Sequence, residues 1–183
     1  MATYKLLTND KIEAVLKLQS LNLKHNLSED KRMSQGFLTI SHDVEVLSDM
    51  NSNVPGIIAV DGNEIVGFCL SMSREFQHTI PLLVPMFELF ENLEVNGLGL
   101  SSINYITVGQ VCVDEAYRGL GIFKNLYHAF RTLHQPDYEL AVTEIAAKNM
   151  RSMSAHTRIG FKFLHQYTAP DGEVWNIVYW DWK

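Results

Sequence analysis

The chain has 183 residues, of which 46% are hydrophobic and 20% charged, and its formal net charge is −6 at pH 7. This length suits one domain with a sizeable core, so residues 1–183 are expected to form a single domain. The acidic balance argues against nucleic acid or a membrane as a partner, because either would need a basic patch, and no apolar run reaches the ~20 residues of a membrane-spanning helix.

The cysteines and the N-terminal residues bear on the cellular compartment. Cys69 and Cys112 each lie inside an apolar, strand-like run, which is typical of buried free thiols in a reducing compartment. The first residues contain no apolar signal core. We therefore expect a cytoplasmic protein.

The first half of the chain alternates between apolar periodic runs and turn residues. These patterns predict a strand over residues 3–7 and then a helix that begins at a capping box of Asp10 and Glu13. A loop or short helix is expected over 24–38, followed by a helix over 42–50 that Ser41 caps. Two strands, 57–60 and 64–73, are then joined by the hairpin turn Asp61-Gly62-Asn63.

The second half of the chain also alternates between apolar periodic runs and turn residues. It predicts a helix from about Pro85 to residue 93, a turn at Asn96-Gly97, a strand over 103–113, an amphipathic helix from Ile122 that closes before Pro136, a strand over 139–146, a helix from Asn149 to a cap at Gly160, and a hairpin of strands 161–168 and 173–182. The order β-α-α-β-β-α-β-α-β-α-β-β predicts a mixed α/β sheet.

One stretch, VCVDEAYRGLGIFKNLY from Val111 to Tyr127, joins a strand to a helix through a glycine-rich turn. At such a junction, exposed backbone N–H groups and the positive end of the helix dipole attract an anion, which suits a phosphate-bearing cofactor. A P-loop would need Lys-Ser/Thr where Ile122 and Phe123 stand, and a dinucleotide fingerprint would need a further small residue. Neither pattern fits.

A second motif narrows the choice of ligand. VxVDxxYRGLGI is followed about thirty residues later by AxKNxxSxxxHxxxGF, and the pair resembles the GNAT superfamily of acetyl-CoA-dependent N-acetyltransferases. Arg118 and Gly121 match its Arg/Gln-x-x-Gly-x-Gly/Ala hallmark, whereas Phe123 stands at the final small residue. The second motif matches in order and spacing at Asn149, His156, Gly160 and Phe161.

The resemblance implies a mixed, mostly antiparallel central sheet flanked by helices, with a splayed strand pair at the cofactor site. It also implies acetyl-CoA as co-substrate, with the end of the central strand bonding the pantetheine arm and the glycine turn surrounding the pyrophosphate. The cofactor-binding residues it implies are Val111, Cys112, Val113, Arg118, Gly119, Leu120, Gly121, Ile122, Phe123, Asn149 and Ser152.

The implied reaction transfers the acetyl group to a primary amine of a small molecule or peptide, by direct attack in a ternary complex. His156 stands where many family members have an acid tyrosine, and it could act as acid, as base or only as a packing residue. Glu144 lies where some members, the ribosomal-protein N-acetyltransferases among them, have a base. Alternatively it is a sheet residue paired with a cation. Gln110 could orient a water or substrate, or be a core amide.

The acceptor pocket is expected between segments 24–38 and 74–80 and the last hairpin, with aromatic candidates Phe37, Phe76, Tyr105, Tyr167 and Trp175. The histidines show no metal-ligand spacing, so no metal is expected. A homodimer is left open. Two other functions also remain open: a non-catalytic acyl-CoA-binding sensor of the same fold, and an acyltransferase for a longer acyl group.

Overall fold

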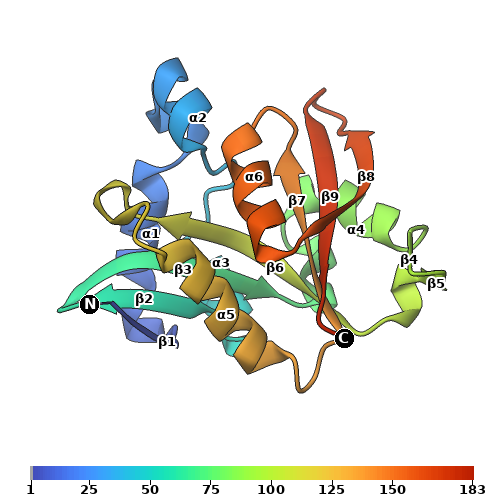
Figure 1. Ribbon diagram of the computed structural model, residues 1–183, viewed down its shortest axis with the longest axis horizontal. Helices are drawn as coiled ribbons and strands as arrows, with labels where there is room; N and C mark the ends of the chain where they lie inside the picture. The colour runs from blue at the N-terminus through green and yellow to red at the C-terminus, as the bar shows by residue number, and fades with distance from the viewer. Residues whose placement is uncertain (1) are drawn as a thin grey trace.

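A seven-stranded sheet runs through the computed structural model, which describes residues 2–183 (Figure 1). The strand order is β1-β2-β3-β6-β7-β9-β8, and only β6 and β7 are parallel neighbours. The strands are β1 (Thr3–Leu6), β2 (Ile57–Asp61), β3 (Glu64–Met72), β6 (Tyr105–Val113), β7 (Leu140–Ala146), β8 (Lys162–Thr168) and β9 (Val174–Asp181). A separate two-stranded hairpin consists of β4 (Glu94–Val95) and β5 (Leu98–Gly99).

Helices cover both faces of the sheet. They are α1 (Ile12–Leu21), α2 (Glu29–Gln35), α3 (Val44–Asn53), α4 (Val84–Phe90), α5 (Ile122–His134) and α6 (Met150–Ile159). Apolar side chains of α5 pack on one face, whereas those of α1, α3 and α4 pack on the other. On α5 the buried Leu126, Tyr127 and Phe130 recur at helical spacing, and Lys124 and His128 are exposed, so the amphipathic pattern places this helix on the sheet.

The sheet divides at its centre. β6 and β7 pair only from Tyr105–Leu140 to Thr107–Val142, although both strands continue beyond that point. Gly109 is the extra residue of a bulge in β6, because Val108 and Gln110 pair with consecutive residues of β3. The splayed strand pair and the mostly antiparallel sheet are therefore confirmed.

Two predicted caps are wrong. No side chain among residues 2–183 caps α1, because a short 3-10 turn over Asn9–Lys11 places Lys11, whose side chain has no acceptor, at the N-cap, and Asp10 accepts from the Thr8 hydroxyl instead. The cap of α3 is Asp43, whose carboxylate accepts from the N–H of Val46 at 2.8 Å; Ser41 lies outside the helix. A carboxylate at this position satisfies an orphan donor and the helix dipole together.

The segment expected to be a loop or short helix over 24–38 contains α2, which Ser28 caps. After α2, residues 36–40 run between Asn149 at the start of α6 and Gln110 on β6, whose side chains bond the carbonyls of Phe37 and Ile40; they are called the crossing segment below. None of the helices in residues 2–183 is long and apolar enough to cross a membrane.

Candidate active site

Two cavities meet where β6 and β7 separate. The larger, of about 350 Å³, is lined by Arg118, Gly119 and Gly121 of the glycine turn and by the first turn of α5, and is called the glycine-turn cavity; Leu120 does not line it. The smaller, of about 100 Å³, lies toward α4 and is called the Glu144 cavity. Their shared lining residues are Phe37, Leu38, Val111, Asn149 and Ser152.

The glycine turn has an open backbone. Gly119 and Gly121 both have φ of +80°, and a Cβ placed on either would meet no heavy atom within 4 Å. Gly121 is the N-cap of α5 and offers no side chain to its N–H groups, so those of the first turn face outward. Leu120, between the two glycines, is 67% exposed. The turn can therefore bind an anion through its main chain.

The end of β6 offers backbone groups to the same space. The N–H of Asp114 donates to the carbonyl of Val66 on β3 at 2.9 Å. Since successive residues of a strand point their N–H groups to opposite sides, those of Val113 and Val111 point toward the splay. There they have no partner on β7, because the β6–β7 ladder has already ended. Buried Cys112 alternates with them, and burial raises the pKa of its thiol to about 12.

Positive charge collects around the glycine-turn cavity although the protein is acidic overall. Its described lining includes four cationic side chains and no carboxylate. The Arg118 guanidinium is held by the carbonyl of Val113 (3.1 Å) and by the side chains of Gln35 (2.9 Å) and Asn22 (2.7 Å). The other three cations are Lys124, Arg151 and Arg158.

Asn149 connects α6 to the crossing segment. Its Oδ1 accepts from the N–H of Ser152 at 3.2 Å, and its Nδ2 donates to the carbonyl of Phe37 at 3.1 Å. Gly36 lies so close that an added Cβ would approach Oδ1 to 3.0 Å. Asn149 thus caps the helix, as expected, and also fixes a wall that both cavities share.

His156 is buried beneath the Glu144 cavity and has both ring nitrogens bonded. Its Nδ1 lies 2.8 Å from the carbonyl of Ser152, which can only accept, so Nδ1 carries the hydrogen. Nε2 then accepts from the hydroxyl of Tyr127 at 2.6 Å. Burial lowers the pKa of His156 to about 4, against the opposing effect of the Ser152 carbonyl, so the ring is neutral at pH 7. This environment favours the packing alternative.

Phe123 joins the same aromatic group. Its ring centroid lies 5.1 Å from that of Tyr127 and 5.3 Å from that of His156, in edge-to-face contacts. The large side chain therefore packs on neighbouring rings and still lines the glycine-turn cavity, where its backbone belongs to the first turn of α5.

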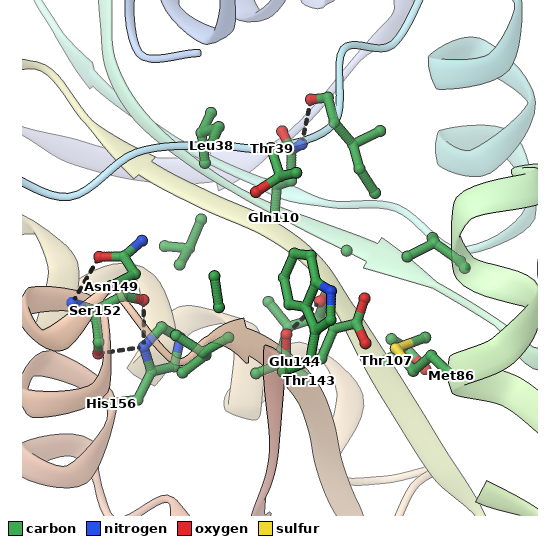
Figure 2. A pocket seen from close by; sticks show the side chains of 18 of the residues that line it. Leu38, Thr39, Met86, Thr107, Gln110, Thr143, Glu144, Asn149, Ser152 and His156 are labelled. Atoms are coloured by element: carbon green, nitrogen blue, oxygen red, sulfur yellow. Dashed lines mark hydrogen bonds between the residues drawn. The ribbon is translucent and has the colours of Figure 1, made fainter. Parts of the chain in front are cut away.

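Glu144 stands in the middle of the smaller cavity (Figure 2). Its Oε2 accepts from the hydroxyl of Tyr167 on β8 at 2.6 Å. Burial raises the pKa of Glu144 to about 7, Tyr167 lowers it through that bond, and the negative charge of Asp171 raises it. Among the described residues the carboxylate is therefore bonded to a tyrosine and not paired with a cation. The sequence did not predict this partner, because an isolated acidic residue in a strand does not indicate which side chain will face it.

Gln110 is a core amide, which is one of the two roles that its place in the sequence leaves open. Its Nε2 donates to the carbonyl of Ile40 at 2.6 Å, and its Oε1 accepts from Nε2 of Gln19 at 2.7 Å. Gln19 also contacts His42 Nδ1 at 2.7 Å and accepts from the N–H of His42. This buried network fixes the far end of the crossing segment.

The expected pocket aromatics divide into two sets. Phe37 and Trp175 line the Glu144 cavity, and Tyr167 bonds its carboxylate. Phe76 and Tyr105 pack in the apolar core beside it and do not line it. No described residue of 74–80 reaches the cavity. The wall on that side comes from Met72, Leu83 and Met86, which an apolar pattern cannot distinguish from core residues.

The described residues place no group of three His, Cys, Asp or Glu side chains where it could hold a metal ion. A phosphate-bearing thioester substrate such as acetyl-CoA fits the larger cavity, because open N–H groups, free strand donors and cations lie along one continuous wall.

Comparisons with known proteins point the same way. Residues 23–161 match the acetyltransferase (GNAT) family. No curated protein matches the chain. Among solved structures, the ribosomal-protein-S18-alanine N-acetyltransferase of Escherichia coli has a TM-score of 0.65 at 13% identity, with 99% of this chain and 94% of that chain covered. The NatC complex bound to Gag peptide and CoA has a TM-score of 0.66 at 15% identity, with 100% of this chain and 99% of that chain covered.

A third structure, yncA of Salmonella typhimurium with its cofactor acetyl-CoA, has a TM-score of 0.63 at 10% identity, with 100% of this chain and 94% of that chain covered. At these identities the likeness shows the fold alone. The fold and the two cavities define an acetyltransferase-type α/β domain. The chain belongs to the acetyltransferase (GNAT) family, which confirms the resemblance seen in the sequence motifs.

Proposed function

We propose that the protein transfers the acetyl group of acetyl-CoA to the primary amine of a small molecule or peptide. The observation that carries this proposal is the meeting of two cavities at the splay. One is lined by open N–H groups and cations, and the other holds a carboxylate with a raised pKa. When bound, acetyl-CoA would supply the activated acyl group.

The chain's own residues would bind this substrate along the glycine-turn cavity. The first-turn N–H groups of α5 would hold the pyrophosphate, and the N–H groups of Val111 and Val113 would pair with the amide-bearing arm. Lys124 and Arg158 are exposed at the cavity and suit its remaining phosphate charge. Arg118 would have a structural role instead. Its guanidinium already donates to Gln35 on α2, to Asn22 and to the carbonyl of Val113 at the end of β6.

Glu144 is proposed as the general base. An alkylamine has a pKa near ~10.4 and must lose a proton before it attacks. A carboxyl with a pKa of about 7 is half ionised near neutral pH and can accept that proton. The hydroxyl of Tyr167 bonds Oε2, which leaves Oε1 for the acceptor.

His156 remains a proposed site residue, in a positioning role. Its ring supports Ser152 and packs against Phe123, beside the boundary of the two cavities. A thiol has a pKa near ~8.5, so the leaving group can depart as a thiolate without an obligatory acid.

The non-catalytic acyl-CoA-binding alternative also has support. His156, at the position of the acid tyrosine of many family members, is neutral with both ring nitrogens bonded, so a reaction here would depend on unassisted departure of the thiolate. The cytoplasmic location stays a prediction under either function.

The experiment measures thiol release from acetyl-CoA across a panel of primary amines. Wild-type protein should turn over at least one amine, and Glu144→Gln should lower kcat by about 10²–10⁴-fold. Glu88→Gln, an exposed glutamate on α4, is the matched control and should leave kcat unchanged. Acetyl-CoA binding without turnover of any amine would favour the binding module instead.

A further inference from the structure

We infer that the Glu144 cavity accepts a short monoamine that is otherwise uncharged and carries a neutral hydrogen-bonding group, which Thr107 recognises. This inference rests on the proposed function and names the acceptor class of the same site.

The hydroxyl of Thr107 carries the inference. Thr107 is 1% exposed and lines the Glu144 cavity, and its Oγ1 has no hydrogen-bond partner among the described residues. A buried hydroxyl without a partner costs free energy, so native proteins rarely leave one. The neighbouring Thr143 on β7 shows the ordinary solution, because its Oγ1 donates to the carbonyl of Val108 at 2.9 Å. A ligand group would complete the Thr107 site.

The register of the strands sets the spacing to Glu144. Thr107 pairs with Val142 across the parallel β6–β7 ladder, and Glu144 lies two residues further along β7 on the same face. Two residues of strand span about 7 Å and neighbouring strands lie about 4.8 Å apart, so the Cα atoms of Thr107 and Glu144 are separated by about 8 Å or slightly more. Figure 2 shows Glu144 between His156 on one side and Thr107 with Met86 on the other. An amine at Glu144 and a polar group at Thr107 would thus be separated by a few bonds.

The charges that line the cavity limit which further charged groups the acceptor can carry. Its described lining contains one carboxylate, Glu144, and no lysine or arginine, and His156 is neutral. A second ammonium or a carboxylate on the acceptor would therefore be buried without a counter-charge. The remaining wall combines apolar side chains, among them Met72, Leu83 and Met86, with uncharged polar ones such as Thr39 and Gln110.

The size of the cavity limits the size of the acceptor that it can enclose. Its volume is about 100 Å³. The wall at Ile40 cannot easily retreat, because its carbonyl accepts from Gln110, which in turn bonds Gln19. The part of an amine that the cavity encloses must therefore be small, and a branch toward Ile40 would have to displace this buried network.

The test uses amino alcohols with two to four carbons and alkylamines of matched length, with a diamine and an amino acid of similar size as charged comparisons. KM is measured with acetyl-CoA, and binding is measured on the CoA-loaded protein. Wild type should favour the best amino alcohol over its alkylamine by about three- to tenfold, and both charged compounds should be poor. Thr107→Val should bring that ratio close to one, and Thr107→Ser should restore it. Thr157→Val, at an exposed threonine of α6 whose hydroxyl donates to the carbonyl of Met153, should keep the wild-type ratio.

An amino alcohol that shows no preference in KM or in binding, or a preference that survives in Thr107→Val, overturns the inference while amine acetylation itself stands. If the preference is seen in binding but no amine is acetylated, the proposed reaction fails and the acceptor class holds. If nothing in the series binds, the inference is wrong.

Discussion

At the scale of single residues, the proposed chemistry depends on the environment of Glu144. Burial disfavours the ionised carboxylate, and the hydroxyl of Tyr167 partly offsets that effect by donating to it. The folded-state pKa of about 7 lies above the ordinary 4.5, so the folded state holds an extra proton between these values. Glu144 therefore makes folding less favourable as pH rises through this range, by about 3 kcal/mol once it is fully ionised.

This arrangement predicts the effect of Tyr167→Phe. Without the hydroxyl, the ionised form of Glu144 loses a hydrogen bond, so its pKa should rise above about 7. The rising limb of kcat against pH should then move to higher pH, and activity at pH 7 should fall several-fold and recover in alkaline buffer. A matched change far from the site, Tyr4→Phe on β1, provides the control. A limb that stays in place would remove Glu144 from the titration.

At the scale of elements, the strand–turn–helix unit from β6 to α5 presents the groups proposed to bind phosphate. Its turn uses positive φ at both glycines, and nothing fills the space where side chains would stand. Such a conformation is easy for glycine alone, so a substitution there costs about 1–2 kcal/mol whether or not a ligand binds. That cost has to be separated from any effect on binding.

Gly121→Glu and Gly62→Glu make this separation. Gly62 has φ of +59° in the β2–β3 turn and also has no heavy atom within 4 Å of an added Cβ. Both variants should lose similar stability, measured by urea unfolding. Gly121→Glu alone should lose affinity for CoA by more than tenfold, because a carboxylate would face the phosphates, and calorimetric titration measures this. Equal affinities for CoA would refute the site.

Much of this unit could be predicted from the sequence, because glycines after an apolar strand and before an amphipathic helix carry local signals. The caps of α1 and α3 could not be chosen so well, since Asp10, Ser41 and Asp43 are all acceptable capping residues in isolation. The residues that line the Glu144 cavity were harder still to predict from the sequence. Thr107, Met72 and Met86 look like ordinary strand and helix residues, and only the separation of β6 from β7 turns them into a cavity wall.

At the scale of the whole molecule, three histidines make stability depend on pH: His134 and His156 are buried and His42 is half-buried. Burial lowers the pKa of His42, His134 and His156 to about 4, whereas the unfolded value is 6.5. The unfolded chain therefore binds more protons between these values, and stability present above pH 6.5 is lost as pH falls toward 4. Glu144 has the opposite effect on stability. Between pH 4.5 and pH 7 the folded state binds about one proton more at Glu144 than the unfolded chain does, which offsets about one of the protons bound by the unfolded histidines.

The expected result is a net uptake of about two protons on unfolding near pH 5.5, which lowers the free energy of unfolding by about 3 kcal/mol per pH unit. Urea unfolding at several pH values measures this slope. His134→Gln should reduce it by about one proton, because the buried imidazole that bonds Ser71 is gone. His128→Gln, exposed on the same helix, should leave it unchanged. A free energy of unfolding that stays constant from pH 6.5 to 5 would contradict the prediction.

The crossing segment has a thermodynamic consequence for the proposed reaction. Phe37 and Leu38 line both cavities, and the Asn149 amide holds the carbonyl of Phe37 from below. If one ligand orders this shared wall, the binding free energies of the two ligands are coupled, and such coupling is reciprocal. The factor by which bound acceptor would raise the affinity for acetyl-CoA then equals the factor by which bound acetyl-CoA would raise the affinity for the acceptor. The two substrates of this chain would then bind cooperatively, with the apparent affinity for each set by the concentration of the other.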